Sequence, residues 1–233
     1  MTIYGAQLFV VCPEIANFRL DKTECRWHSL DIILVTGSFY LDENANVPYK
    51  IGPSLRYANL FKRQSYMPNR KNTLVLMSYM ESSAIFTQQI AFQTEPFENL
   101  VFKFHRAAPH PTLRRLIIGS CRIISGDLYD ALENIRFVIG SASGALLEAI
   151  VLGIPVIVTR DPQNVQFSYI PEIGRGLLWA EVSSASQVPA SIEQLLLASE
   201  NRREEALDAR AKMRKQCFGI EPTAEAIKLA FDL

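Results

Sequence analysis

The residues best suited to chemistry lie in a short polar turn between two apolar segments. The turn reads Gly-Ser-Ala-Ser-Gly over residues 140–144, and Glu148 follows one helical turn later. The N–H groups that open a helix have no partner inside it and carry partial positive charge, so they can bind a phosphate where side chains are small. Glu148 could accept hydrogen bonds from sugar hydroxyls. The pattern is typical of a nucleotide site, although such a turn can also be pure scaffold.

The segments around the turn predict how it is held. Phe137–Ile139 and Val156–Val158 are short apolar runs typical of buried strands. Ala145–Leu152 between them is rich in helix-forming residues, and Ser141 or Ser143 is placed to cap that helix. A Gly-x-Pro sequence then ends the helix. Neither the P-loop pattern nor the dinucleotide fingerprint Gly-x-Gly-x-x-Gly is present here.

Strands and helices alternate from about residue 73 onward, which predicts an α/β fold with a Rossmann-like parallel sheet and helices on both faces. In such sheets ligands bind at the carboxyl ends of the strands. Strands are predicted at Thr73–Ser78, Leu100–Phe104, Arg122–Ile124, Phe137–Ile139, Val156–Val158 and Gly176–Trp179. Helices are predicted at about 82–93, and at Pro111–Ile117, Leu128–Asn134, Ala145–Leu152, Ala190–Ser199, Arg202–Cys217 and Thr223–Phe231.

The first part of the chain lacks this alternation. Phe9–Cys12 and Asp31–Thr36 could be strands, whereas Asp42–Pro53 reads as a loop. We therefore expect two domains: residues 1–60 as a partial amino-terminal lobe or linker region, and residues 61–233 as a Rossmann-like domain that carries the nucleotide site. The first piece is either an adapted front segment or the stub of a larger domain.

Composition excludes several classes of protein. The 233 residues carry 24 basic and 24 acidic side chains, so a general nucleic-acid binder with a basic face is disfavoured. No apolar run approaches the ~20 residues of a membrane-spanning helix. The amino-terminal segment lacks the features of a signal peptide. The four cysteines show no C-x-x-C spacing, which favours free thiols in a reducing cytoplasm.

Three motifs occur in a fixed order along the chain. Gly-Pro-Ser-Leu-Arg-Tyr occupies 52–57, Lys-Phe-His occupies 103–105, and Ser-x-Ser-Gly-x3-Glu-Ala-x3-Gly-Ile-Pro-Val-Ile occupies 141–157. Together they resemble the carboxyl-terminal, donor-binding half of GT-B glycosyltransferases, with the nearest likeness to bacterial surface-carbohydrate and capsule transferases. The resemblance covers roughly residues 50–233. The last motif also recurs in related GT-B sugar epimerases.

The resemblance implies roles for the residues that match these motifs. It implies that the Ser turn binds the donor diphosphate, that Glu148 binds the ribose, and that two strand-end residues act on the donor phosphates. The donor-binding residues so predicted are Ser141, Ser143, Gly144, Glu148, Arg56 of the linker motif and Asn164 of the loop after the fifth strand. The predicted catalytic residues are His105 and Lys103, whose charge would stabilise a departing nucleotide diphosphate.

One position departs from the family pattern. Arg106 stands where the family's Lys-x-His-Pro motif has proline, and His110-Pro111 follows a few residues later. The functional histidine is therefore either His105 or His110. We favour His105 because the strand places it at the carboxyl edge of the sheet.

The resemblance implies a nucleotide-sugar donor, a carbohydrate or lipid-linked acceptor and no bound metal, since no Asp-x-Asp motif is present. The predicted function is a glycosyltransferase, or its donor-binding domain, in surface polysaccharide biosynthesis. A GT-B-type sugar-nucleotide epimerase and a non-catalytic donor-binding subunit of a split transferase stay open as alternatives. So does association with a partner subunit or with the inner face of the membrane. The acceptor's general base would come from the first lobe, where Asp42, Glu43 and His28 are candidates by chemistry alone.

Overall fold

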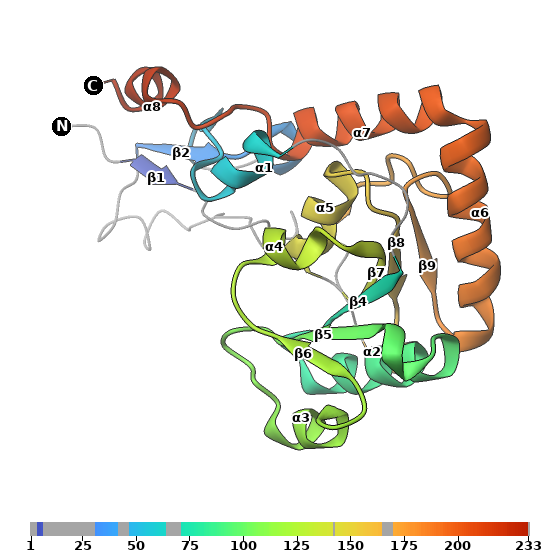
Figure 1. Cartoon of the computed structure of the whole chain (residues 1–233). Helices are drawn as coiled ribbons and strands as arrows, with labels where there is room; N and C mark the ends of the chain where they lie inside the picture. The colour runs from blue at the N-terminus through green and yellow to red at the C-terminus, as the bar shows by residue number, and fades with distance from the viewer. Residues whose placement is uncertain are drawn as a thin grey trace. The chain divides into compact units, whose positions relative to one another are not determined.

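The computed structural model describes residues 4–6, 31–41, 47–63, 71–141, 143–164 and 170–232. Its contacts divide the chain into two compact units (Figure 1). Unit 1 comprises Met1–Arg63 and Ala211–Leu233, and unit 2 comprises Gln64–Arg210. The final 23 residues, which the sequence analysis assigned to the second domain, thus group with the amino-terminal piece.

Unit 2 is built on a six-stranded parallel sheet, as the alternating pattern predicts. The strand order is β6-β5-β4-β7-β8-β9, and every pair is parallel. The strands are β4 (Asn72–Leu76), β5 (Leu100–Lys103), β6 (Arg122–Ile124), β7 (Ile135–Gly140), β8 (Val156–Thr159) and β9 (Trp179–Val182). Its helices are α2 (Glu81–Thr94), α3 (Pro111–Ile117), α4 (Leu128–Leu132), α5 (Gly144–Val151) and α6 (Val188–Asn201), with α7 (Arg203–Cys217) following.

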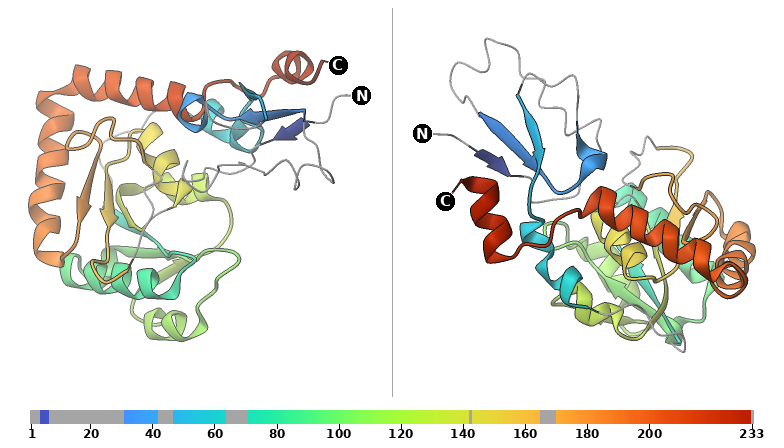
Figure 2. Two further views of the ribbon diagram at one scale, coloured as in Figure 1. Left: turned by 180° about the vertical axis from the view of Figure 1, so that it is seen from behind. Right: turned by 90° about the horizontal axis from the view of Figure 1, so that it is seen from above.

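Helices cover both faces of this sheet. Figure 1 shows α2 and α3 on one side and α4 and α5 on the other, and the view from behind in Figure 2 agrees. On the first side, residues of α2, α3 and α6 join strand residues in one buried apolar cluster. A buried pair of hydroxyls joins α2 to β8 on that side: Thr87 Oγ1 donates to the Ser83 carbonyl and accepts from Thr159 Oγ1 at 2.7 Å.

The prediction of the sixth strand was wrong by three residues. It was expected at Gly176–Trp179, whereas β9 runs from Trp179 to Val182. Gly174 and Gly176 adopt φ values of +70° and +77°, which suit a turn and not a strand. The N–H groups of the two leucines after Gly176 donate to the Gly174 carbonyl. Because the chain turns here, β9 begins only at Trp179. Helix α4 likewise ends two residues earlier than expected, at Leu132.

Unit 1 contains a small parallel sheet in the order β1-β2-β3. Its elements are β1 (Tyr4–Ala6), β2 (Ile32–Val35), β3 (Tyr49–Ile51), α1 (Ala58–Lys62) and α8 (Ala224–Phe231). Strand β2 confirms the expected strand at Asp31–Thr36. Strand β3 corrects the expected loop at Asp42–Pro53, because a three-residue strand is too short to show a periodic pattern. The expected strand at Phe9–Cys12 lies outside the described residues.

The carboxyl-terminal segment packs into unit 1 through a few close contacts. The rings of Tyr57 and Phe218 meet edge to face at 4.7 Å, and the Gly219 N–H donates to the Thr36 carbonyl at 2.7 Å. A Cβ atom on Gly37 would lie 2.0 Å from the Gln216 carbonyl oxygen. The backbone of Gly37 and that of the α7 terminus therefore approach more closely than any other residue type at position 37 would allow.

The core of unit 1 predicts a loss of stability at high pH. Cys217 is fully buried beside Tyr40, and burial raises the pKa of its thiol from 9.0 to about 12. Below pH 9 the thiol is protonated in both states. Between pH 9 and about 12 it ionises only in the unfolded chain, so the free energy of unfolding falls.

We therefore expect Cys217→Ala to lose less stability than the unchanged protein between pH 8 and pH 10. Urea titrations followed by circular dichroism at the two pH values measure this difference. The Cys121 thiol is present in both proteins, so its titration cancels in the comparison. An equal loss in both proteins would contradict the prediction.

The described residues contain neither a membrane-spanning helix nor a cluster of metal-binding side chains. Each helix among them is too short or too polar to cross a membrane. Across the same residues, no three His, Cys, Asp or Glu side chains gather as they would around a metal ion.

Candidate functional site

The carboxyl ends of the six strands of unit 2 form one edge of the sheet. The chain starts the sheet at β4, adds β5 and β6 on one side, and then returns to add β7 on the other side of β4. The strand order therefore reverses between β4 and β7, where α/β sheets bind ligands. Residues paired in register mark this edge across the whole sheet: Ile124, Lys103, Leu76, Gly140, Val158 and Glu181.

The Ser turn leaves β7 at this reversal point. Ser143 is the N-cap of α5, and its Oγ accepts a hydrogen bond from the Ala145 N–H at 3.3 Å. Of the two serines that could cap the helix, it is therefore Ser143 that does so. The N–H of Gly144, the first residue of α5, has no acceptor within the helix.

Ser141 is the unusual member of the turn. Its side chain is only 2% exposed, yet its Oγ has no hydrogen-bond partner among the described residues. Burying a hydroxyl without a partner is costly, and such groups are rare in native proteins. A ligand atom that accepts or donates at this position would satisfy the hydroxyl.

Close packing beneath the Ser turn explains why its first residue, Gly140, is a glycine. A Cβ atom on Gly140 would lie 2.9 Å from Leu146 Cδ2 and 3.3 Å from Leu76 Cβ. Because Gly140 lacks a side chain, the first turn of α5 can lie directly against the ends of β4 and β7. The amides of α5 are thereby brought to the reversal point of the sheet.

Glu148 faces α4 from the second turn of α5. Its carboxylate accepts a 2.5 Å hydrogen bond from the hydroxyl of Tyr129, which is buried. Tyr129 is held in turn by Asp127, whose side chain caps α4 by accepting the Tyr129 N–H at 2.7 Å. Sequence analysis missed Tyr129, because it lies 19 residues from Glu148 and belongs to no motif. The contact fixes the direction of the Glu148 side chain.

Lys103 ends β5 and turns to the same loop before α4. Its Nζ donates to the Gly126 carbonyl at 2.6 Å. Partial burial lowers the pKa of Lys103, and the nearby Asp127 carboxylate opposes that shift. Lys103 and Gly140 both pair in register with Leu76 of β4, which lies between them at the carboxyl edge of the sheet.

The two candidate histidines have different environments. His110 is buried, and its Nε2–H donates to the Ser78 carbonyl at 2.8 Å, which ties the start of α3 to the end of β4. His105 is exposed, and its Nδ1 accepts the Ala107 N–H at 3.2 Å. The neutral His105 ring therefore carries its proton on Nε2, for which the described part of the chain provides no acceptor. The choice of His105 as the functional histidine stays a prediction.

The chain was compared with known proteins. No family model matches it, and no curated protein matches it. Solved structures do match over nearly the whole chain. Anabaena HepE in complex with UDP and glucose aligns with a TM-score of 0.58 at 10% identity, covering 99% of this chain and 70% of HepE.

Two further structures give similar alignments. The spinosyn rhamnosyltransferase SpnG with spinosyn aglycone has a TM-score of 0.55 at 16% identity, covering 90% of this chain and 60% of SpnG. The pneumococcal O-GlcNAc transferase GtfA with UDP and GlcNAc has a TM-score of 0.52 at 16% identity, covering 99% of this chain and 51% of GtfA. This chain has a GT-B glycosyltransferase fold. It spans between about half and 70% of the length of these three proteins.

Within this GT-B fold, two predicted donor-binding residues belong to the other unit or are otherwise engaged. Arg56 is exposed on a short 3-10 helix of unit 1 (Leu55–Tyr57), whereas the turn belongs to unit 2. Asn164 follows β8, and its side-chain amide donates to the Asp161 carboxylate at 2.5 Å. Asp161 also accepts the Gln163 N–H at 2.9 Å, so the side chains stabilise a local turn. The roles of Arg56 and Asn164 stay predictions.

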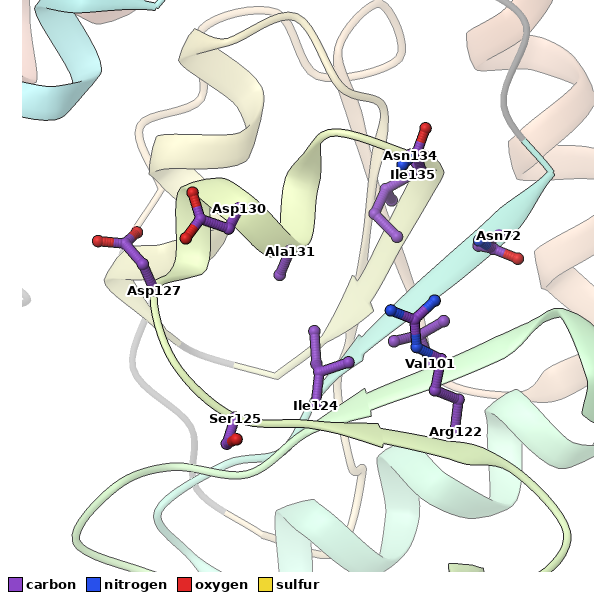
Figure 3. A pocket seen from close by; sticks show the side chains of 10 residues that line it. All are labelled: Asn72, Val101, Arg122, Ile124, Ser125, Asp127, Asp130, Ala131, Asn134 and Ile135. Carbon is purple, nitrogen blue, oxygen red and sulfur yellow. The ribbon is translucent and has the colours of Figure 1, made fainter.

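A separate cavity of about 170 Å³ lies between α4 and the sheet of the GT-B fold. Figure 3 shows apolar side chains in its middle, with Arg122 and Asn72 toward one end and Asp127 toward the other. None of the residues predicted for donor binding lines it. The cavity and the Ser turn are therefore different places.

Proposed function

We propose that this chain binds a nucleotide sugar at the carboxyl edge of the unit 2 sheet and serves as a glycosyltransferase or its donor-binding part. The observation that carries the proposal is the buried, unpartnered Oγ of Ser141 in a small-residue turn that opens α5. A diphosphate there would accept from Ser141 and from the first amides of the helix. Its negative charge would be stabilised by the positive end of the α5 dipole.

The neighbouring side chains suit the other parts of the donor. Glu148, oriented by Tyr129, would accept hydrogen bonds from ribose hydroxyls. Lys103 and the Nε2–H of His105 would face the phosphates. The three structures compared above support a nucleotide-sugar donor, since two of them hold UDP and a sugar. We propose no metal, because the helix dipole and the Lys103 ammonium group supply the positive charge.

The chemistry follows from this placement. An acceptor hydroxyl oxygen forms a bond to the anomeric carbon of the donor, and the bond from that carbon to the diphosphate oxygen breaks. The electron pair stays on the diphosphate, where Lys103, His105 and the amides of α5 stabilise the added charge. The hydroxyl proton goes to a general base. The earlier candidates His28, Asp42 and Glu43 lie outside the described residues.

The acceptor and the cellular role are finer proposals. We propose a carbohydrate or lipid-linked acceptor in surface polysaccharide assembly, in the cytoplasm, on the basis of the sequence resemblance. A partner subunit is part of the same proposal. A solved GtfA/B complex, which aligns with a TM-score of 0.50 at 16% identity and covers 99% of this chain, supports it.

A nucleotide panel tests the proposal directly. Thermal unfolding is measured with UDP, GDP, CDP, CMP and dTDP at millimolar concentration. A ligand that binds only the folded state at ~100-fold excess over Kd adds about 2.7 kcal/mol of stability. We expect one base to raise the unfolding temperature clearly, and Glu148→Ala to reduce the shift.

A matched variant controls for loss of charge. Glu204→Ala removes an exposed carboxylate from α7 and should leave the nucleotide-induced shift unchanged. The absence of a shift with every nucleotide would overturn the proposed function. A shift that persists unchanged in Glu148→Ala would remove Glu148 from the site.

A further inference from the structure

An exposed apolar patch lies beside the proposed donor site. Tyr79 and Met80 lie in the loop between β4 and α2, and each is 60% exposed, while Ile85 in the first turns of α2 is 38% exposed. Large apolar side chains rarely gather on a free surface unless they contact something. These three lie where β4 ends, next to the strand whose end carries the Ser turn. Their position suggests a contact with the donor.

The loop that carries Tyr79 is held in place. The Met80 N–H donates to Ser78 Oγ at 3.2 Å, and the Ser78 carbonyl accepts from buried His110. The His105 ring meets the Tyr79 ring edge to face, with 5.6 Å between centroids and an angle of 85° between planes. His105 is itself fixed by the Ala107 N–H. Tyr79 is therefore an exposed aromatic ring with a defined position, so it would lose little conformational freedom on binding a ligand.

The direction of the bound donor decides which part of it reaches Tyr79. Glu148 lies on α5, which covers the same face of the sheet as α4, and it contacts Tyr129 there. A ribose at Glu148 places the nucleoside on that side of the Ser turn. Tyr79 leads into α2, which covers the opposite face. The other end of the diphosphate, which carries the sugar, then extends toward Tyr79.

We propose that Tyr79 stacks against the sugar of the bound nucleotide sugar and makes the site prefer the sugar conjugate. This inference rests on the proposed function. A sugar ring presents C–H groups on one face, and an aromatic ring with an apolar face and negative potential packs well against them. Met80 adds apolar surface beside Tyr79.

Isothermal titration calorimetry with two ligands isolates the sugar contact. The ligands are the nucleoside diphosphate identified by the panel and the glucose conjugate of the same base. We expect Tyr79→Ala to weaken the sugar conjugate about five- to tenfold, as for loss of one aromatic stacking contact, and to change the affinity for the free diphosphate less than twofold. Tyr79→Phe keeps the ring and should bind both ligands nearly as the unchanged protein does.

A control and the possible outcomes separate the two proposals. Leu116→Ala removes an exposed apolar side chain from α3 and should change neither affinity. An equal loss for both ligands in Tyr79→Ala, or no loss for either, would overturn the sugar contact while leaving the donor site intact. If the unchanged protein binds no nucleotide at all, the proposed function fails and this inference fails with it.

Discussion

Replacing Ser143 with Asp is expected to abolish nucleotide binding while leaving the protein folded. Asp is as good an N-cap as Ser, so α5 keeps its cap and its favourable dipole interaction. The new carboxylate would, however, lie where the diphosphate is proposed to bind. Two like charges 4 Å apart repel by about 4 kcal/mol in partly shielded surroundings, so the affinity should fall at least about 100-fold.

The matched variant is Ser143→Asn, which has the same shape as Asp and a similar capping ability but no charge. Calorimetry with the nucleotide chosen by the panel should show binding to Ser143→Asn and none to Ser143→Asp. Thermal unfolding without ligand should be similar for the two variants. If Ser143→Asp binds the nucleotide as the unchanged protein does, the phosphates lie elsewhere in the fold.

The second large effect is on stability. Phe137 lies in the middle of β7, is fully buried, and belongs to the apolar cluster that joins the sheet to α2, α3 and α6. Phe137→Ala should therefore lower the free energy of unfolding of unit 2 by about 3–5 kcal/mol, through lost burial and the cavity left behind. The same change removes packing contacts from β7, the strand that ends in the Ser turn.

Urea unfolding followed by the fluorescence of Trp179, in a Trp27→Phe background, reports this loss for unit 2. Phe137→Leu keeps most of the volume and should cost less than about 1.5 kcal/mol, so it serves if the alanine variant does not fold. Leu116→Ala, at an exposed site, should stay within about 0.5 kcal/mol of the unchanged protein. A loss below about 1 kcal/mol in Phe137→Ala would contradict the described core.

The sheet could be predicted from the sequence because its signals are local. Apolar runs such as Leu100–Phe104 and the small residues of the Ser turn identify strands and a turn without reference to the rest of the chain. Strand β9 was misplaced because Leu177 and Leu178 look like strand residues, whereas the φ values of the glycines before them form a turn. Local composition does not show that conformation.

Residues of the candidate site could be predicted from the sequence only where they belong to a motif. The Ser turn, Glu148 and Lys103 belong to motifs, and Lys103 and Gly140 lie in one register row at the carboxyl ends of the strands. Tyr129 and Tyr79 belong to none, because their contacts join segments that meet only after folding. The separation of Arg56 into the other unit also follows from long-range contacts, which a linear motif does not record.

The hydrogen bond from Lys103 to the Gly126 carbonyl preorganises the lysine for the diphosphate that is proposed to bind there. An ammonium group has three N–H donors, and this contact uses one of them. Two donors remain for phosphate oxygens, so the carbonyl need not be released when a diphosphate arrives. A free lysine side chain carries about 2 kcal/mol of rotamer entropy that binding would have to overcome. Much of that ordering is already complete in the folded protein, so each phosphate contact made by Lys103 costs less entropy.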